Sequence, residues 1–127
     1  MIVVDTSALM AIVLEEPQGA ACMGALESED DLLISAGTVA ETLIVAGRRN
    51  ISDVISGLIE DLNLTVVPVS AAVARRVALA YAQWGKGVHP AGLNFGDCFA
   101  YALAKERDCP LLYVGEDFGK TDLRPAI

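Results

Sequence analysis

The chain has 127 residues, of which 54% are hydrophobic, and this is enough for one domain with a single core. Its longest apolar run, residues 8–14, is far shorter than the roughly 18 residues of a membrane-spanning helix, and a net charge of −8 excludes a broadly basic nucleic-acid surface. Cys22, Cys98 and Cys109 fit neither a disulfide framework nor a zinc site, so we expect one domain over residues 1–127 in the reducing cytoplasm, outside any membrane.

The first part of the chain predicts two buried strands, each followed by helix. Thr6 or Ser7 can cap the first helix, Pro17 suits the first turn of the second, and Thr38 can cap the third. In chain order the predicted elements are strand 2–4, helix 8–14, helix 17–26, strand 32–34 and helix 39–48.

The second part continues the alternation of strand and helix. Pro68 ends a strand, Ser70 begins a long Ala-rich helix, and Pro110 precedes another strand. The predicted elements are helix 52–62, strand 64–67, helix 70–84, helix 95–107, strand 111–114 and a short edge strand after residue 122. Short apolar strands separated by helices indicate a parallel sheet covered on both faces, and hence a three-layer α/β domain.

Four acidic residues occupy equivalent places along this pattern. Asp5 ends the first strand, Asp117 follows the fourth, and Glu41 lies in the predicted first turn of the helix after the second strand. Asp97 opens the helix that enters the fourth strand, and a helix antiparallel to its strand begins at that strand's carboxyl end. Because ligands of open parallel sheets bind beyond the carboxyl ends of the strands, we expect all four acids at one edge.

Such a cluster predicts a bound cation. Two unit charges about 5 Å apart repel by roughly 3 kcal/mol at an effective dielectric constant of about 20. Ligation by oxygen alone favours Mg²⁺ or Mn²⁺ over zinc, and Mg²⁺ is commonly held by one or two carboxylates, waters and substrate phosphate. The sequence therefore predicts metal-assisted phosphoryl chemistry.

Each acid also has an ordinary structural explanation. Asp5 and Asp117 suit a helix cap or a turn, and Asp97 suits the positive end of a helix dipole. Glu41 fits a capping box with Thr38. What favours the metal site is the presence of all four at one predicted edge.

Several segments together resemble the PIN-domain ribonucleases, and most closely the VapC toxin group. The resemblance covers essentially the whole chain in the right order. The segments that carry it are Asp5-Thr6-Ser7, Ala40-Glu41, Asn94-Phe95-Gly96-Asp97 and Gly115-Glu116-Asp117-Phe118. One departure is Glu116, where relatives often carry Asn or Asp.

The resemblance implies both a fold and a function. It implies a three-layer α/β/α domain with a five-stranded, mostly parallel sheet and a Mg²⁺- or Mn²⁺-dependent endoribonuclease. It assigns metal coordination to Asp5 and Asp97, with Glu41 and Asp117 completing a catalytic set of four. It further implies an RNA substrate, a cognate VapB-type antitoxin and a homodimer, with the helices between residues 8 and 62 as contact surfaces.

Two alternatives stay open from the residues alone. A phosphatase of the haloacid-dehalogenase type would form an aspartyl phosphate on Asp5, but it needs a second acid where Ser7 stands. A non-enzymatic module would use the acidic patch to bind a basic peptide.

Overall fold

Strand residues of alternating orientation build two apolar cores, one on each face of a parallel sheet. The computed structural model describes residues 1–127. In chain order the elements are β1 (Ile2–Val4), α1 (Thr6–Val13), α2 (Gly19–Glu27), β2 (Leu32–Ser35), α3 (Ala36–Arg48), α4 (Ser52–Asp61), β3 (Thr65–Val67), α5 (Ala71–Trp84), α6 (Phe95–Arg107), β4 (Leu111–Leu112) and the 3₁₀ helix η1 (Phe118–Lys120).

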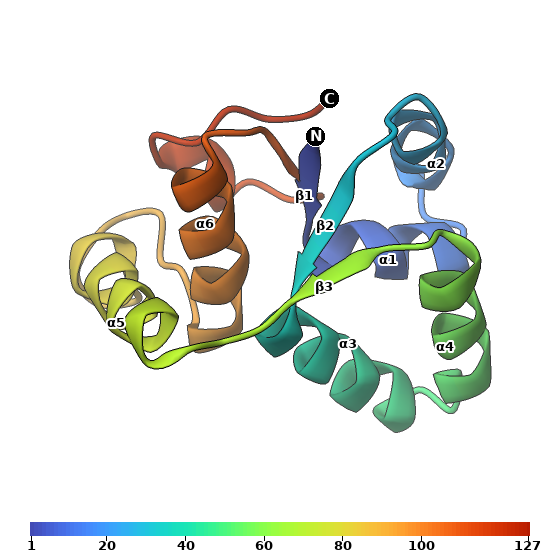
Figure 1. The fold of residues 1–127 in the computed structure, drawn as a ribbon, viewed down its shortest axis with the longest axis horizontal. Coiled ribbons are helices and arrows are strands. Elements are labelled where there is room, and N and C mark those ends of the chain that lie inside the picture. The colour runs from blue at the N-terminus through green and yellow to red at the C-terminus, as the bar shows by residue number, and fades with distance from the viewer.

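The sheet has the strand order β3-β2-β1-β4, and every pairing is parallel. Val3 lies opposite Leu33 and Leu111, and these three pack with α5 and α6 in one core. Ile2 and Val4 belong to the second core, formed with α1, α2, α3 and α4. The predicted three-layer α/β/α class is therefore confirmed, with helices on both sides of the sheet (Figure 1).

The predicted strand count of five is wrong, because the sheet contains four strands. The chain after Asp122 does return to β4, but Pro125 makes only an isolated parallel bridge with Leu111. The bonds of this bridge run from the Leu111 amide to the Arg124 carbonyl and from the Ala126 amide to the Leu111 carbonyl, and no second residue pair extends them into a strand. The fourth strand is also shorter than predicted, since the Val114 amide donates to the Ser7 hydroxyl instead of to a neighbouring strand.

Three predicted helix starts need correction, and each has a local cause. Asp5 caps α1, so this helix begins at Thr6. Ser35 caps α3, so Thr38 lies inside this helix and does not cap it. Pro17 lies in a turn that precedes α2.

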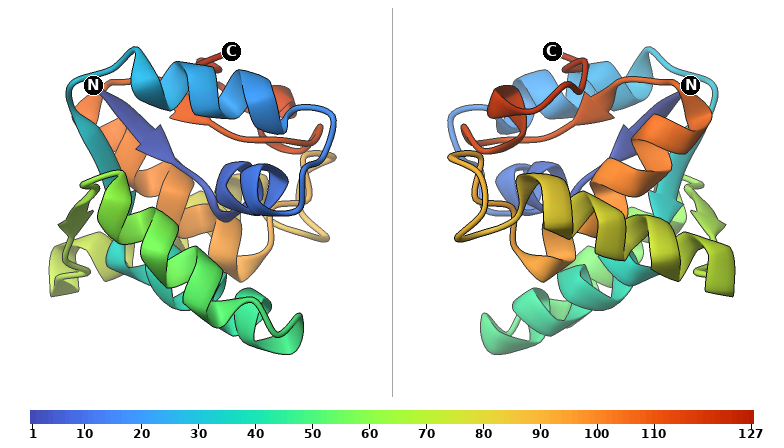
Figure 2. Two further views of the ribbon diagram at one scale, coloured as in Figure 1. Left: turned by 90° about the vertical axis from the view of Figure 1, so that its right-hand side faces the viewer. Right: turned by 90° about the vertical axis from the view of Figure 1, so that its left-hand side faces the viewer.

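Three predicted helix starts are confirmed: α4 begins at Ser52, Ser70 caps α5, and α6 spans the predicted residues 95–107. No helix combines the length and apolarity needed to cross a membrane. The two side views in Figure 2 show α1, α2 and α4 covering one face of the sheet and α5 and α6 the other.

Candidate active site

The four predicted acids lie at the end of the sheet where the strands terminate. Asp5 directly follows β1 and is only 3% exposed, whereas Asp117 lies in an exposed turn after β4. Asp97 is in the first turn of α6. Glu41 is in the second turn of α3 and not the first, because α3 starts earlier than predicted. The charges of Glu41 and Asp97 both act on Asp5, and those of Glu41 and Asp117 act on Asp97.

One oxygen of Asp5 is bound by the protein, and the other has no partner. Oδ2 accepts hydrogen bonds from the Ser7 amide at 3.0 Å and the Ser7 hydroxyl at 2.6 Å. The same hydroxyl accepts a bond from the Val114 amide at 2.9 Å, so Ser7 joins the ends of β1 and β4. Oδ1 is buried without any hydrogen-bond partner. A buried unpaired carboxylate oxygen is costly, and it indicates a missing ligand.

Glu41 shows the same division between its two oxygens. The Thr6 hydroxyl donates to Oε1 at 2.7 Å and also contacts the Thr42 hydroxyl at 2.9 Å. A Cβ atom added at Gly96 would overlap the Glu41 carboxylate. Gly96 therefore allows this carboxylate to lie directly against the first turn of α6, one residue before Asp97.

Asp97 forms a capping box with Asn94 at the start of α6. Its Oδ2 accepts the Asn94 amide at 2.9 Å, while the Asn94 side chain accepts the Asp97 amide at 2.8 Å. This uses one oxygen and leaves Oδ1 available. The capping box considered for Thr38 and Glu41 does not form, because Thr38 lies inside α3 and Glu41 points to Thr6.

The surroundings of two acids disfavour their ionised forms. Burial, reinforced by the charges of Asp97 and Glu41, raises the pKa of Asp5 to about 7 despite the opposing bonds from Ser7. Burial also raises the pKa of Asp97 to about 6, with smaller contributions from Glu41 and Asp117. Both carboxyls would be held ionised by a bound cation.

These features fit a hard divalent cation. Asp5, Glu41 and Asp97 each offer one carboxylate oxygen that no protein group satisfies, and neither histidine nor cysteine contributes. No three acidic, histidine or cysteine side chains converge closely enough to form a complete metal cage. Mg²⁺ needs no such cage, because it commonly keeps several waters and takes only one or two carboxylates.

The contacts of three polar residues around the acids were not predicted, although Thr6 and Asn94 lie in the segments that carry the resemblance. Thr6 donates to Glu41, 35 residues further along the chain, and contacts Thr42, and no sequence pattern predicts this pairing. Asn94 did leave a signal, since the spacing Asn-x-x-Asp before a helical pattern is typical of a capping box.

Comparison with known proteins identifies the family of this chain. The family model of the PIN domain matches residues 2–123. Ribonuclease VapC28 of Mycobacterium tuberculosis is 44% identical over 129 residues, which cover 98% of this chain and 97% of the relative. The chain therefore belongs to the PIN-domain family and, within it, to the VapC ribonucleases.

Solved structures share the fold at low sequence identity. The crystal structure of Mycobacterium tuberculosis VapC20, a Sarcin-Ricin loop cleaving toxin, aligns with a TM-score of 0.75 at 16% identity, covering 98% of this chain and all of the other. A toxin–antitoxin complex from Klebsiella pneumoniae aligns with a TM-score of 0.71 at 17% identity, covering 96% of this chain and 93% of the other.

Proposed function

We propose that this chain is the toxin of a type II toxin–antitoxin system: a Mg²⁺-dependent endoribonuclease that hydrolyses RNA phosphodiester bonds and is inhibited by a cognate VapB-type antitoxin. The observation that carries the proposal is the set of three neighbouring carboxylates, each with one oxygen held by a protein donor and the other available. Membership of the VapC ribonucleases supports the same activity and argues against the phosphatase and non-enzymatic alternatives.

The four acids have different roles in this proposal. Asp5 and Asp97 would hold the cation, with their orientations fixed by Ser7 and the first turn of α6. Glu41, whose other oxygen is held by Thr6, would orient the attacking water, and the exposed Asp117 would complete the acidic rim. Bound Mg²⁺, or Mn²⁺ in its place, supplies charge neutralisation at the scissile phosphate and lowers the pKa of its water.

Replacing Asp5 or Asp97 with Asn tests the proposal. Either change keeps the side-chain size and removes the charge that holds the cation, so cleavage of total cellular RNA should fall by about 100-fold or more. Asp30→Asn, at an exposed position, is the matched control and should cleave like the wild type. Full activity in the folded Asp5→Asn and Asp97→Asn variants would refute the proposal, as would wild-type cleavage that persists after complete chelation.

The proposed partners follow from charge and exposed apolar surface. A net charge of −8 suits a basic antitoxin segment. Leu43 on α3 and Val54 on α4 are 40% and 57% exposed and suit the homodimer or antitoxin contact. The three cysteines of the chain are free, which suits the reducing cytoplasm where we place the protein.

Co-expression with a candidate VapB-type antitoxin, identified as a small reading frame with a basic tail beside the gene, tests these partners. Light scattering of the purified chain and of its complex should give a dimer alone and a larger complex with the antitoxin. A monomer that fails to bind the antitoxin would reject this part of the proposal.

A further inference from the structure

An apolar pocket opens beside the acids, between α3 and the start of α6. It has a volume of about 350 Å³, and its walls include Glu41, Ile44, Arg48, Phe95 and Phe99. Pockets of this size hold small planar ligands. Glu41 belongs both to this pocket and to the acidic site, so a group in the pocket is next to any phosphate bound by the acids.

The aromatic wall of the pocket has one exposed ring. Phe95 is 71% exposed, which makes it the most exposed of the large hydrophobic side chains. Phe99 lies one helical turn further along α6 and meets Phe95 edge to face, with ring centroids 5.0 Å apart and an interplanar angle of 83°. A Cβ added at Gly37 would overlap the Phe99 ring, so the glycine lets this supporting ring sit against α3. Phe99 therefore supports the Phe95 ring while leaving it accessible to a ligand.

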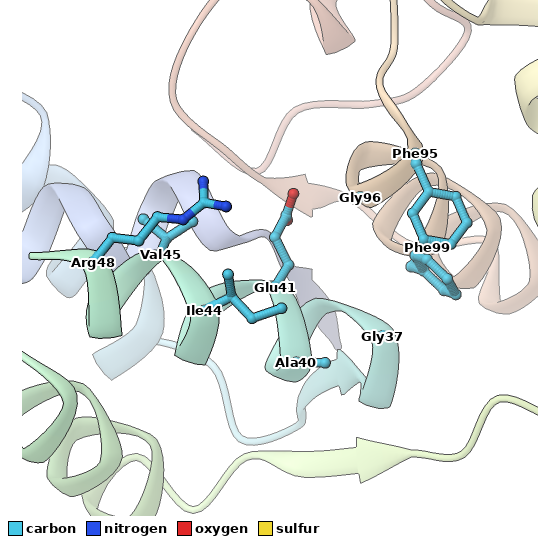
Figure 3. Close-up of a pocket in the computed structure, with 9 residues that line it drawn as sticks. All are labelled: Gly37, Ala40, Glu41, Ile44, Val45, Arg48, Phe95, Gly96 and Phe99. Carbon is cyan, nitrogen blue, oxygen red and sulfur yellow. The ribbon is translucent and has the colours of Figure 1, made fainter.

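The opposite side of the pocket carries a positive charge. Arg48 takes part in none of the four salt bridges of the protein. Figure 3 shows the Glu41 carboxylate between Arg48 on one side and Phe95 and Phe99 on the other. A ligand here therefore meets an aromatic ring, an acidic site that binds phosphate through its cation, and a free guanidinium.

We infer that this pocket binds one unstacked nucleobase of the RNA, stacked on Phe95, in the nucleotide next to the scissile phosphate. The inference rests on the proposed ribonuclease function and adds the part of the substrate that the acids do not contact. Proteins that recognise single-stranded RNA stack splayed bases on aromatic rings. Arg48 lines the same pocket and offers a cation to the base edge or to the following phosphate.

The inference is tested by removing the Phe95 ring from the protein and a base from the RNA, first separately and then together. End mapping of a mixed-sequence single-stranded RNA pool first locates cleavage sites for the wild type. A 12-nucleotide RNA with one mapped site is then compared with copies that carry an abasic nucleotide at each position flanking the cut. Phe95→Leu should lower kcat/KM on the intact RNA by roughly 5- to 100-fold, the scale of base–aromatic stacking, and Phe95→Trp should retain activity.

The decisive result is the coupling between the two removals. At one flanking position, the abasic RNA should be cut equally slowly by the wild type and by Phe95→Leu, because the stacked base is already missing. Leu79→Ala is the matched control: Leu79 is 69% exposed on α5, outside the pocket, and its removal should change nothing. Thermal melts check that Phe95→Leu is folded.

Each other outcome overturns a definite part of the inference. Wild-type cleavage with no coupling at any position rejects the base pocket and leaves the ribonuclease intact. Unchanged cleavage by Phe95→Leu with lost binding of the antitoxin assigns the pocket to the protein partner instead. A wild type that cuts no RNA in the pool with Mg²⁺ present rejects the proposed function and the base pocket together.

Discussion

Replacing Asp5 with Asn should stabilise the metal-free protein while removing its activity. Asp5 is buried, and its environment raises the pKa from the ordinary 3.8 to about 7. That difference corresponds to roughly 4 kcal/mol by which the folded protein disfavours the ionised side chain. The Asn amide carries no charge, and its oxygen can still accept both bonds from Ser7, so the cap of α1 is kept.

One cost opposes this gain. The new amide nitrogen takes the place of the buried Oδ1, which has no partner, and an unpaired buried donor costs about 1–3 kcal/mol. The variant should therefore be about 1–3 kcal/mol more stable than the wild type at pH 8, which is roughly 3–10 °C in Tm for a domain of this size.

The free energy of unfolding should depend on pH differently in the wild type and in Asp5→Asn. Because the folded-state pKa of Asp5 is above its unfolded value, the folded wild type binds more protons between about pH 4 and pH 7. Its free energy of unfolding should fall as the pH rises through this window. In Asp5→Asn this contribution is absent, so the advantage of the variant should shrink as the pH falls from 8 and disappear or reverse near pH 5.

Urea denaturation of both proteins in EDTA, from pH 5 to pH 8, measures this directly. Asp30→Asn, at an exposed position, controls for a change in net charge. An Asp5→Asn variant that is less stable than the wild type at pH 8, or that keeps the full wild-type slope with pH, would refute the reasoning. It would mean that Asp5 is already compensated inside the folded protein without a cation.

Three further predictions concern the neighbouring groups. Gly96→Ala should lower the rate of RNA cleavage by at least about tenfold, because the new Cβ atom would displace the Glu41 carboxylate. Its Tm should stay close to that of the wild type, since alanine suits a helix. Cleavage at the wild-type rate would contradict this. Thr6→Val should cost about 1–2 kcal/mol in urea denaturation and lower activity, whereas Thr6→Ser keeps the hydroxyl and should behave like the wild type. The Mg²⁺ concentration for half-maximal cleavage should rise by about tenfold or more when the pH is lowered from 8 to 6. Asp5 and Asp97 have pKa values of about 7 and about 6, so both take up protons in this range, and these protons compete with the cation. A Mg²⁺ requirement that does not change with pH would count against both residues as ligands.

The sheet and the edge where the acids meet could be predicted because they follow from topology. Parallel strands joined by helices place their carboxyl ends together, so Asp5, Glu41, Asp97 and Asp117 could be assigned to one edge without coordinates. The roles of these residues as ligands and catalysts stay a prediction.

Helix starts were less predictable, because neighbouring residues offer equally good caps. Ser35 and Thr38 both carry a side-chain oxygen suited to this role, and only the strand before them decides that Ser35 takes it. The predicted fifth strand is wrong because the apolar pattern after Asp122 does not show how many residue pairs will form with β4, and only one bridge does.

Contacts between distant segments could not be predicted from pattern. The bond from Thr6 to Glu41 and the close approach of Phe99 to Gly37 depend on how α1, α3 and α6 pack. Periodicity identifies the apolar side of each helix and says nothing about which side chains meet across an interface.

The position of β1 has a consequence for synthesis of the protein. This strand is made long before β4, with which it pairs, and Ser7 just after it is hydrogen-bonded to Val114, 107 residues later. A growing polypeptide that stops before residue 111 leaves one edge of β1 open and lacks the amide that secures Ser7. The acidic residue that ends β1 can therefore be held in its final position only after residue 114 has been synthesised and has folded back onto the first strand.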